Sequence, residues 1–257
     1  CALAEVLWSD STQRNYRNFM QRMETHFKRF DAMNVNYSLT AYDVKVNSRF
    51  DTVKNTLEVV LQTDAPNSQI YYSLDDADLS TDAMLYRKPV VLDKTTTLYA
   101  GVFRNKALIS RVCDEKFAVH KASGKKVIYK NDYHEKYSAK GNRTLTDGRF
   151  GSKNFNDGFW QGFEGADLSV VIDLERVQTI QRISSSYFQC VRSWIFLPEF
   201  VEYSVSNDGI HFTTIGKLKN TILKKTENVV IKPFELDIKP ISCRFVKVRA
   251  KTIGTCP

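Results

Sequence analysis

One stretch of aromatic and planar polar residues could bind a small polar ligand. Trp194 and Phe188 offer flat apolar surfaces, and Arg192 and Gln189 offer hydrogen-bonding groups. Such a set can hold a sugar ring, because the C–H face of the ring packs on an aromatic plate while its hydroxyls need directed polar partners. We expect the four residues on one loop, within 187–196, between two strands.

A second set of similar chemistry lies in the glycine-rich stretch 156–164, with Trp160 and Glu164 as candidate contacts. Trp160 also suits a position in a hydrophobic core, and we favour the core for it. For Trp194 and Arg192 a binding role and a structural role stay open.

The sequence offers little for catalysis. Adjacent carboxylates occur at Asp114-Glu115, but they lie in a predicted strand, where neighbouring side chains point to opposite faces. The four histidines are far apart, so no metal site follows from them. The five cysteines have no Cys-x-x-Cys spacing, and we expect mostly buried free thiols, although a Cys190–Cys256 bridge is geometrically open.

Length and composition indicate a globular protein of two or three domains. The chain has 257 residues, of which 42% are hydrophobic and 26% charged, and a formal net charge of +8.

Its cations are dispersed along the sequence, without a helix-turn-helix or RNP-like motif, so we expect no nucleic-acid partner. No apolar run is long enough to cross a bilayer, and we expect no membrane partner. The chain starts as if within a helix, which suggests the C-terminal part of a larger protein.

The N-terminal residues predict two helices. Residues 1–8 have helical propensity, and the polar run 9–12 offers capping side chains for a second helix. Apolar residues then recur at three- and four-residue spacing, which predicts an amphipathic helix. These residues are Tyr16, Phe19, Met20, Met23, Phe27, Phe30 and Met33.

Short alternating strands separated by turns follow, which predicts an antiparallel sandwich. The expected strands are Leu57–Thr63, Gln69–Leu74, Pro89–Leu92, Thr95–Phe103 and Cys113–Val119. Residues 121–126 are small, polar and basic, and are predicted to be a linker. In the last part, 168–174 reads as a strand, and 201–216 reads as a hairpin around Asn207-Asp-Gly209.

The last 130 residues resemble the F5/8 type C (discoidin-like, galactose-binding-like) family. The resemblance rests on Leu145-Thr-Asp-Gly148, Trp160, the strand ending Asp173-Leu174, Ser206-Asn-Asp-Gly209 with Phe212, and Arg244-Phe-Val-Lys-Val-Arg249. It implies a β-sandwich over 127–257 that binds carbohydrate through loops at one end. It also implies a structural calcium with Asp147 as a candidate ligand, and the alternative that Asp147 simply starts a turn stays open. It further implies one more strand after Pro257. No other cofactor is expected.

Two further resemblances concern residues 1–120. Residues 2–9, 16–19 and 28–37 are similar to the end of the catalytic (β/α)₈ barrel of family 20 β-N-acetylhexosaminidases. Residues 38–120, with Ile70-Tyr-Tyr-Ser-Leu-Asp75, look like the immunoglobulin-like domain that follows that barrel. The family's catalytic Asp-Glu pair would lie upstream, so this chain is expected to be inert alone.

The resulting expectation is a mainly β protein with a short helical segment at 1–37, an immunoglobulin-like spacer at 38–120, and a discoidin-like sandwich. The parent would be an exported bacterial enzyme, periplasmic or at the cell surface, that releases terminal GlcNAc or GalNAc. The partners would be GlcNAc-, GalNAc- or galactose-containing glycans. Two alternatives stay open, an adhesion or phospholipid-surface module and a purely structural buttress.

Overall fold

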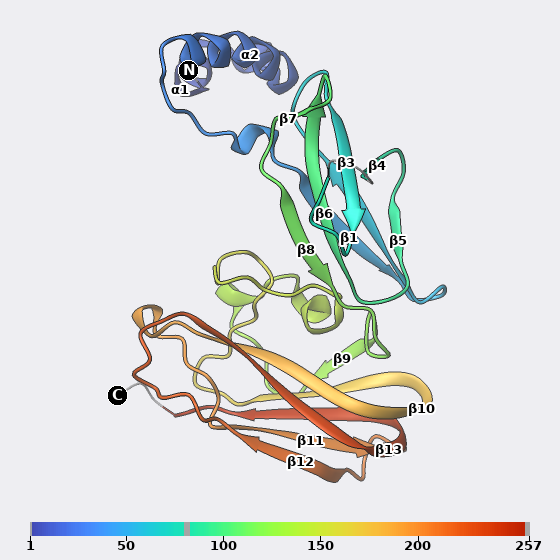
Figure 1. Cartoon of the computed structure of the whole chain (residues 1–257). Coiled ribbons are helices and arrows are strands. Elements are labelled where there is room, and N and C mark those ends of the chain that lie inside the picture. The colour runs from blue at the N-terminus through green and yellow to red at the C-terminus, as the bar shows by residue number, and fades with distance from the viewer. Residues whose placement is uncertain (1, 80–82, 255–257) are drawn as a thin grey trace. The chain divides into compact units, whose positions relative to one another are not determined.

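The structure, a computed structural model, describes residues 2–79 and 83–254 (Figure 1). The chain forms two compact units. The first unit comprises residues 1–49 and 57–117, and the second comprises residues 50–56 and 118–257.

The first unit begins with the helices α1, Ala2–Trp8, and α2, Tyr16–Ala32. The predicted cap for α2 was wrong. Asp10 caps a short 3₁₀ turn, whereas the side chain of Asn15 accepts a hydrogen bond from the backbone N–H of Asn18 at the start of α2. None of the described helices is long and apolar enough to cross a membrane.

Helix α2 packs on the sandwich of the same unit. Its Met20 and Phe27 are buried, and the Phe27 ring stacks on Tyr37 with 4.6 Å between centroids. The Glu24 carboxylate accepts hydrogen bonds from Arg104 and, at 2.7 Å, from the Tyr42 hydroxyl. Burial raises the pKa of Glu24, but these hydrogen bonds outweigh it and hold the pKa below its usual value. The middle of the predicted apolar face, at Met20 and Phe27, therefore has a partner within the unit, whereas Tyr16 and Met33 at its two ends are exposed.

Two antiparallel sheets make the immunoglobulin-like sandwich of the first unit. One has the order β1-β2-β5, and the other has the order β4-β3-β6-β7 with β8 also paired to β6. The bounds are β1 Lys45–Asp51, β2 Thr56–Gln62, β3 Gln69–Leu74, β4 Met84–Leu85, β5 Val90–Leu92, β6 Thr96–Arg104, β7 Ala107–Leu108 and β8 Cys113–Phe117. The predicted strands are present to within two residues. Both sheets contribute core residues, because alternate positions of β2 and β6 are buried.

The second unit has one five-stranded antiparallel sheet in the order β12-β11-β13-β10-β9. The bounds are β9 Lys126–Tyr129, β10 Leu168–Gln189, β11 Phe200–Ser206, β12 Thr213–Lys219 and β13 Val230–Lys251. The hairpin predicted at 201–216 is confirmed as β11 and β12. Its turn contains Gly209 at a φ of +74°, which glycine adopts at low cost.

Strands β10 and β13 bend, which turns one sheet into a sandwich. Their register shifts between Asp173 and Gln178, after which they pair only with each other. Tyr203 of β11 reaches the second layer, where its hydroxyl donates to the Phe234 carbonyl at 2.7 Å and lies 2.7 Å from the Ser185 hydroxyl. The two layers thus face each other across the core (Figure 1).

The predicted fold class is confirmed: the protein is mainly β, with a short N-terminal helical segment followed by two sandwiches.

In the segment predicted as a linker, Ser123 is fully buried, and Gly124 lies against the Phe50 ring, where a Cβ would come within 2.2 Å of a ring carbon. Cys190 and Cys243 are free thiols. The Cys190–Cys256 bridge lies outside the described residues, because Cys256 does.

Candidate functional site

A tight turn after β10 presents Trp194. The residues Val191–Ser193 form a 3₁₀ turn, and Cys190 and Ile195 exchange backbone hydrogen bonds of 2.9 and 3.1 Å across it. Trp194 follows with a φ of +59°, a left-handed conformation that is costly for a bulky residue. The bridge and the hydrogen bond from Trp194 N–H to the Val191 carbonyl hold it there. Trp194 is 66% exposed. The turn therefore exposes an aromatic surface at the cost of a strained backbone conformation.

Arg192 lies on the same turn and is also exposed. The nearest acidic group is the Glu227 carboxylate, with 3.8 Å between nitrogen and oxygen, and both side chains are about four-fifths exposed. A surface pair of this kind contributes little to stability. The guanidinium is therefore available to a ligand beside the indole.

Phe188 and Gln189 were predicted to lie on the loop, but this prediction was wrong, because β10 continues through both residues. Gln189 is only 1% exposed. Its amide donates to the Leu223 carbonyl at 3.1 Å, and its side-chain oxygen accepts from the Leu197 N–H at 3.4 Å. Gln189 thus holds two loops at the base of the turn and has a positioning role.

The second predicted loop joins this base through an aromatic cluster. The Trp160 ring lies 5.2 Å from the buried Phe188 ring, and Phe155 lies 6.4 Å from Phe188 on centroids. The indole N–H of Trp160 donates to the Ser152 carbonyl at 2.9 Å. Its ring also covers Gly151, where a Cβ would come within 2.1 Å of the indole. Trp160 is half-buried and packs against Phe188 near the end of β10.

Glu164 is exposed and lies 3.3 Å from the His134 ring nitrogen. Its contact is therefore with the segment after β9, and the structure does not bring it to Trp194. Asp147 is largely buried. One of its oxygens accepts from the Arg149 N–H, the other lies 3.4 Å from the Lys140 ammonium, and burial raises its pKa.

Sequence reasoning missed Leu223 and Glu227, which lie between β12 and β13. Leu223 is 75% exposed, and its backbone is tied to Gln189. The sequence signal there was only a basic run, and nothing in it indicates that this loop meets the turn at 190–195. The candidate site therefore consists of Trp194, Arg192 and Leu223 at the surface, with Gln189 and Phe188 below.

We predict that Gln189→Ala destabilises the second unit by about 1–3 kcal/mol, because the buried N–H of Leu197 and the carbonyl of Leu223 lose their partner. Urea unfolding followed by circular dichroism measures the change. Gln178→Ala is a control, since the Gln178 amide makes a single hydrogen bond, to the Leu174 carbonyl, and the residue is half-buried. Equal stability of the two variants would contradict the positioning role.

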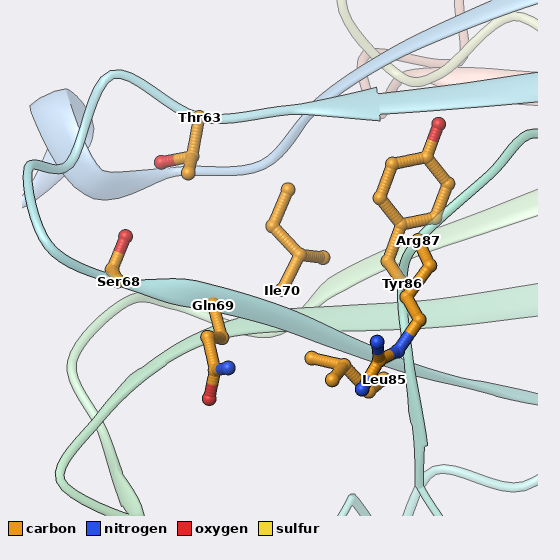
Figure 2. Close-up of a pocket in the computed structure, with 7 residues that line it drawn as sticks. All are labelled: Thr63, Ser68, Gln69, Ile70, Leu85, Tyr86 and Arg87. Carbon is orange, nitrogen blue, oxygen red and sulfur yellow. The ribbon is translucent and has the colours of Figure 1, made fainter.

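The first unit has a hollow of about 390 Å³ at the edge where β3 and β4 meet (Figure 2). Ile70 and Leu85 contribute its apolar lining. The Ser68 hydroxyl donates to the Ala65 carbonyl, and the Thr63 hydroxyl donates to the Tyr42 carbonyl, so both rim hydroxyls bind the protein itself. Within residues 2–79 and 83–254, no group of three or more His, Cys, Asp or Glu residues could hold a metal ion.

Comparison with known proteins gave three results. A family model described as Fn3 associated matches residues 59–117, within the first unit. No curated protein matches. Among solved structures, chitosan-binding module 1 of a chitosanase/glucanase from Paenibacillus sp. IK-5 is 16% identical, with 52% of this chain and 88% of that chain covered and a TM-score of 0.37.

Two further structures match over similar lengths. A fucose-binding module from Streptococcus pneumoniae is 14% identical, covering 52% of this chain and 86% of that chain with a TM-score of 0.36. A CBM32 module from Clostridium perfringens, solved in complex with GalNAc-β-1,3-galactose, is 18% identical, covering 51% of this chain and 85% of that chain with a TM-score of 0.33.

Proposed function

We propose that the second unit binds glycans through the turn that carries Trp194. The observation that carries the proposal is an indole held two-thirds exposed in a costly left-handed conformation, with a solvent-facing guanidinium two residues away. An aromatic plate beside a planar five-donor group matches the C–H face and the hydroxyls of a sugar ring. Binding of GlcNAc, GalNAc or galactose at a chain end needs no deeper cavity.

A glycan array with the intact chain tests this proposal. We expect binding to glycans with terminal GlcNAc, GalNAc or galactose, and we expect the matching free monosaccharide to compete. Dextran serves as a neutral polymer control. Absence of binding to every glycan on the array would contradict the proposal.

One observation favours a second candidate function. Trp194 and Leu223 are large, exposed apolar side chains on loops that Gln189 ties together. Two such tips could insert into a phospholipid surface. Co-sedimentation with phosphatidylserine/phosphatidylcholine vesicles that free monosaccharide does not reduce would support this function over glycan binding.

We further propose that the chain is the non-catalytic C-terminal region of an exported bacterial β-N-acetylhexosaminidase. The sequence resemblance of residues 1–120 supports this proposal. The Asp114-Glu115 pair lies in strand β8, with Asp114 exposed and Glu115 half-buried, which is not the arrangement of a catalytic pair at a barrel end. We expect no hydrolysis of 4-nitrophenyl N-acetyl-β-glucosaminide by this chain. In the parent, the module would raise residence time on polymeric substrate.

A structural calcium at Asp147 is also proposed. The Oδ2 oxygen of Asp147 is buried without a hydrogen-bond partner in the described part of the chain, which suits a hard cation. The Lys140 ammonium, 3.4 Å away, would compete for it.

Calcium binding at this site predicts a concentration-dependent rise in melting temperature. Ligand at one hundred times its Kd stabilises the folded state by about 2.7 kcal/mol. Differential scanning fluorimetry in CaCl₂ or EGTA measures the shift, and we expect Asp147→Asn to abolish it. Identical melting temperatures of the unmodified chain in calcium and in EGTA would contradict the calcium site.

A further inference from the structure

The positive charge of the protein belongs entirely to its C-terminal part. Residues 118–257 contain 22 lysines and arginines against 14 aspartates and glutamates, whereas residues 1–117 contain 15 of each. The net charge of +8 is therefore the net charge of residues 118–257. Because the second unit adds only residues 50–56, with one Asp and one Lys, its net charge is also +8.

Strand register gathers these cations, which are dispersed in sequence, on one face of the five-stranded sheet. Side chains alternate between faces along a strand. The inward positions of β11 and β13, Val201, Tyr203, Val246, Val248 and Ala250, are buried in the core. The alternate positions point outward. We call the outward set the basic face, and it comprises Lys217 and Lys219 of β12 with Lys247, Arg249 and Lys251 of β13.

Cross-strand pairing places these cations in rows. Phe200 of β11 pairs with Lys219 on one side and Lys251 on the other. Glu202 pairs with Lys217 on one side and Arg249 on the other. Neighbouring strands are about 4.8 Å apart, and outward positions along a strand are about 6.8 Å apart. The face therefore presents cations at regular short intervals.

Few carboxylates offset this charge. Asp167 lies 3.2 Å from Arg249 and 3.3 Å from Lys251, and Glu202 lies on the face itself. Lys217, Lys219 and Lys247 form no ion pair with any described residue. Three ammonium groups of the basic face are therefore available to an external anion.

Aromatic rings support two of these ammonium groups. The Lys217 nitrogen lies 3.7 Å from the centroid of the Phe200 ring, and the Lys247 nitrogen lies 5.6 Å from that of Phe212. Cation–π contacts hold these side chains over the sheet. The same contacts cover the rings, which makes them poor platforms for stacking nucleobases, the main contact of proteins that bind single-stranded nucleic acid.

We propose that the basic face binds an anionic polysaccharide, a linear glycan with sulfate or carboxylate groups along its length. Such a chain offers repeated charges to a grid of cations and needs no aromatic plate. Its ionic contacts predict an affinity that falls steeply with salt. This inference goes beyond the proposed function, because it involves neither Trp194 nor Arg192.

Biolayer interferometry with immobilised heparin and polygalacturonate, and with dextran as the neutral polymer, tests the proposal. We expect the intact chain to bind at least one anionic glycan and not dextran, with weaker binding in 200 mM than in 50 mM NaCl. The triple variant Lys217→Glu/Lys219→Glu/Lys247→Glu should lose about tenfold or more in affinity. A matched control, Lys136→Glu/Lys153→Glu/Lys239→Glu, changes three exposed lysines of the same unit that are outside the basic face.

The outcomes separate the interpretations. Equal losses in the two triple variants would mean that net charge alone drives binding, and would overturn the proposal. Tighter binding to single-stranded oligo(dT) than to either anionic glycan would also overturn the proposal. The absence of binding to heparin and to polygalacturonate alike in 50 mM NaCl would do the same. Trp194→Ala should leave this binding unchanged, which distinguishes it from the site of the proposed function. Circular dichroism of each variant confirms that it is folded.

Discussion

Replacing Tyr203 with alanine is expected to lower the free energy of unfolding of the second unit by about 3–5 kcal/mol. The side chain is fully buried in β11, between the two layers of the sandwich. Its loss leaves a cavity and removes the hydrogen bonds to the Phe234 carbonyl and the Ser185 hydroxyl. Urea unfolding, with the two units fitted as separate transitions, measures the change.

Tyr203→Phe separates the ring from the hydroxyl. This variant keeps the packing but leaves a buried carbonyl without its donor, so we expect a loss of about 1–3 kcal/mol. The transition of the first unit should not move in either variant. A loss below about 1 kcal/mol for Tyr203→Ala would contradict the burial of this side chain between two facing layers.

Trp194→Ala is expected to reduce glycan affinity about tenfold or more, because truncating the few residues that dominate a binding site, often tryptophans, costs about 2 kcal/mol or more. Isothermal titration calorimetry with the best ligand from the array measures the change. The fold should be unaffected, since the indole is two-thirds exposed. Arg192→Lys, which keeps the charge but loses the planar fork, should weaken binding less than Arg192→Ala.

Two variants act as controls for this prediction. Trp194→Gly should abolish binding while maintaining or raising stability, because glycine adopts the left-handed conformation without strain. Ile210→Ala removes another exposed apolar side chain, 76% exposed, from the turn between β11 and β12 and should leave affinity unchanged. A Trp194→Ala variant with full affinity would locate the glycan elsewhere.

Local sequence patterns predicted much of the fold. Alternation identified the strands of the first unit, and Asn207-Asp-Gly209 identified the hairpin, because both depend on residues close in sequence. The capping prediction failed for α2, since Asn15 competed with four suitable residues at 9–12. The full length of β10 was missed because Glu175 and Arg176 interrupt its apolar pattern at the bend.

The candidate site was harder to predict. The residues Phe188 and Gln189 have the right chemistry, but the extended β10 buries both. The tie from Gln189 to Leu223 joins residues more than thirty positions apart, which no local pattern reveals. Likewise, Lys217 and Arg249 looked unrelated until cross-strand register placed Glu202 between them. Function here depends on pairings that the sequence does not show.

The most direct test of the glycan site follows the three tryptophan indole N–H signals by NMR during a monosaccharide titration. Single Trp→Phe variants assign the signals of Trp8, Trp160 and Trp194. We predict that the Trp194 signal shifts in a saturable manner while the Trp8 signal does not move. A ligand that binds by calorimetry and leaves the Trp194 signal in place would contradict the assignment of this turn as the glycan site.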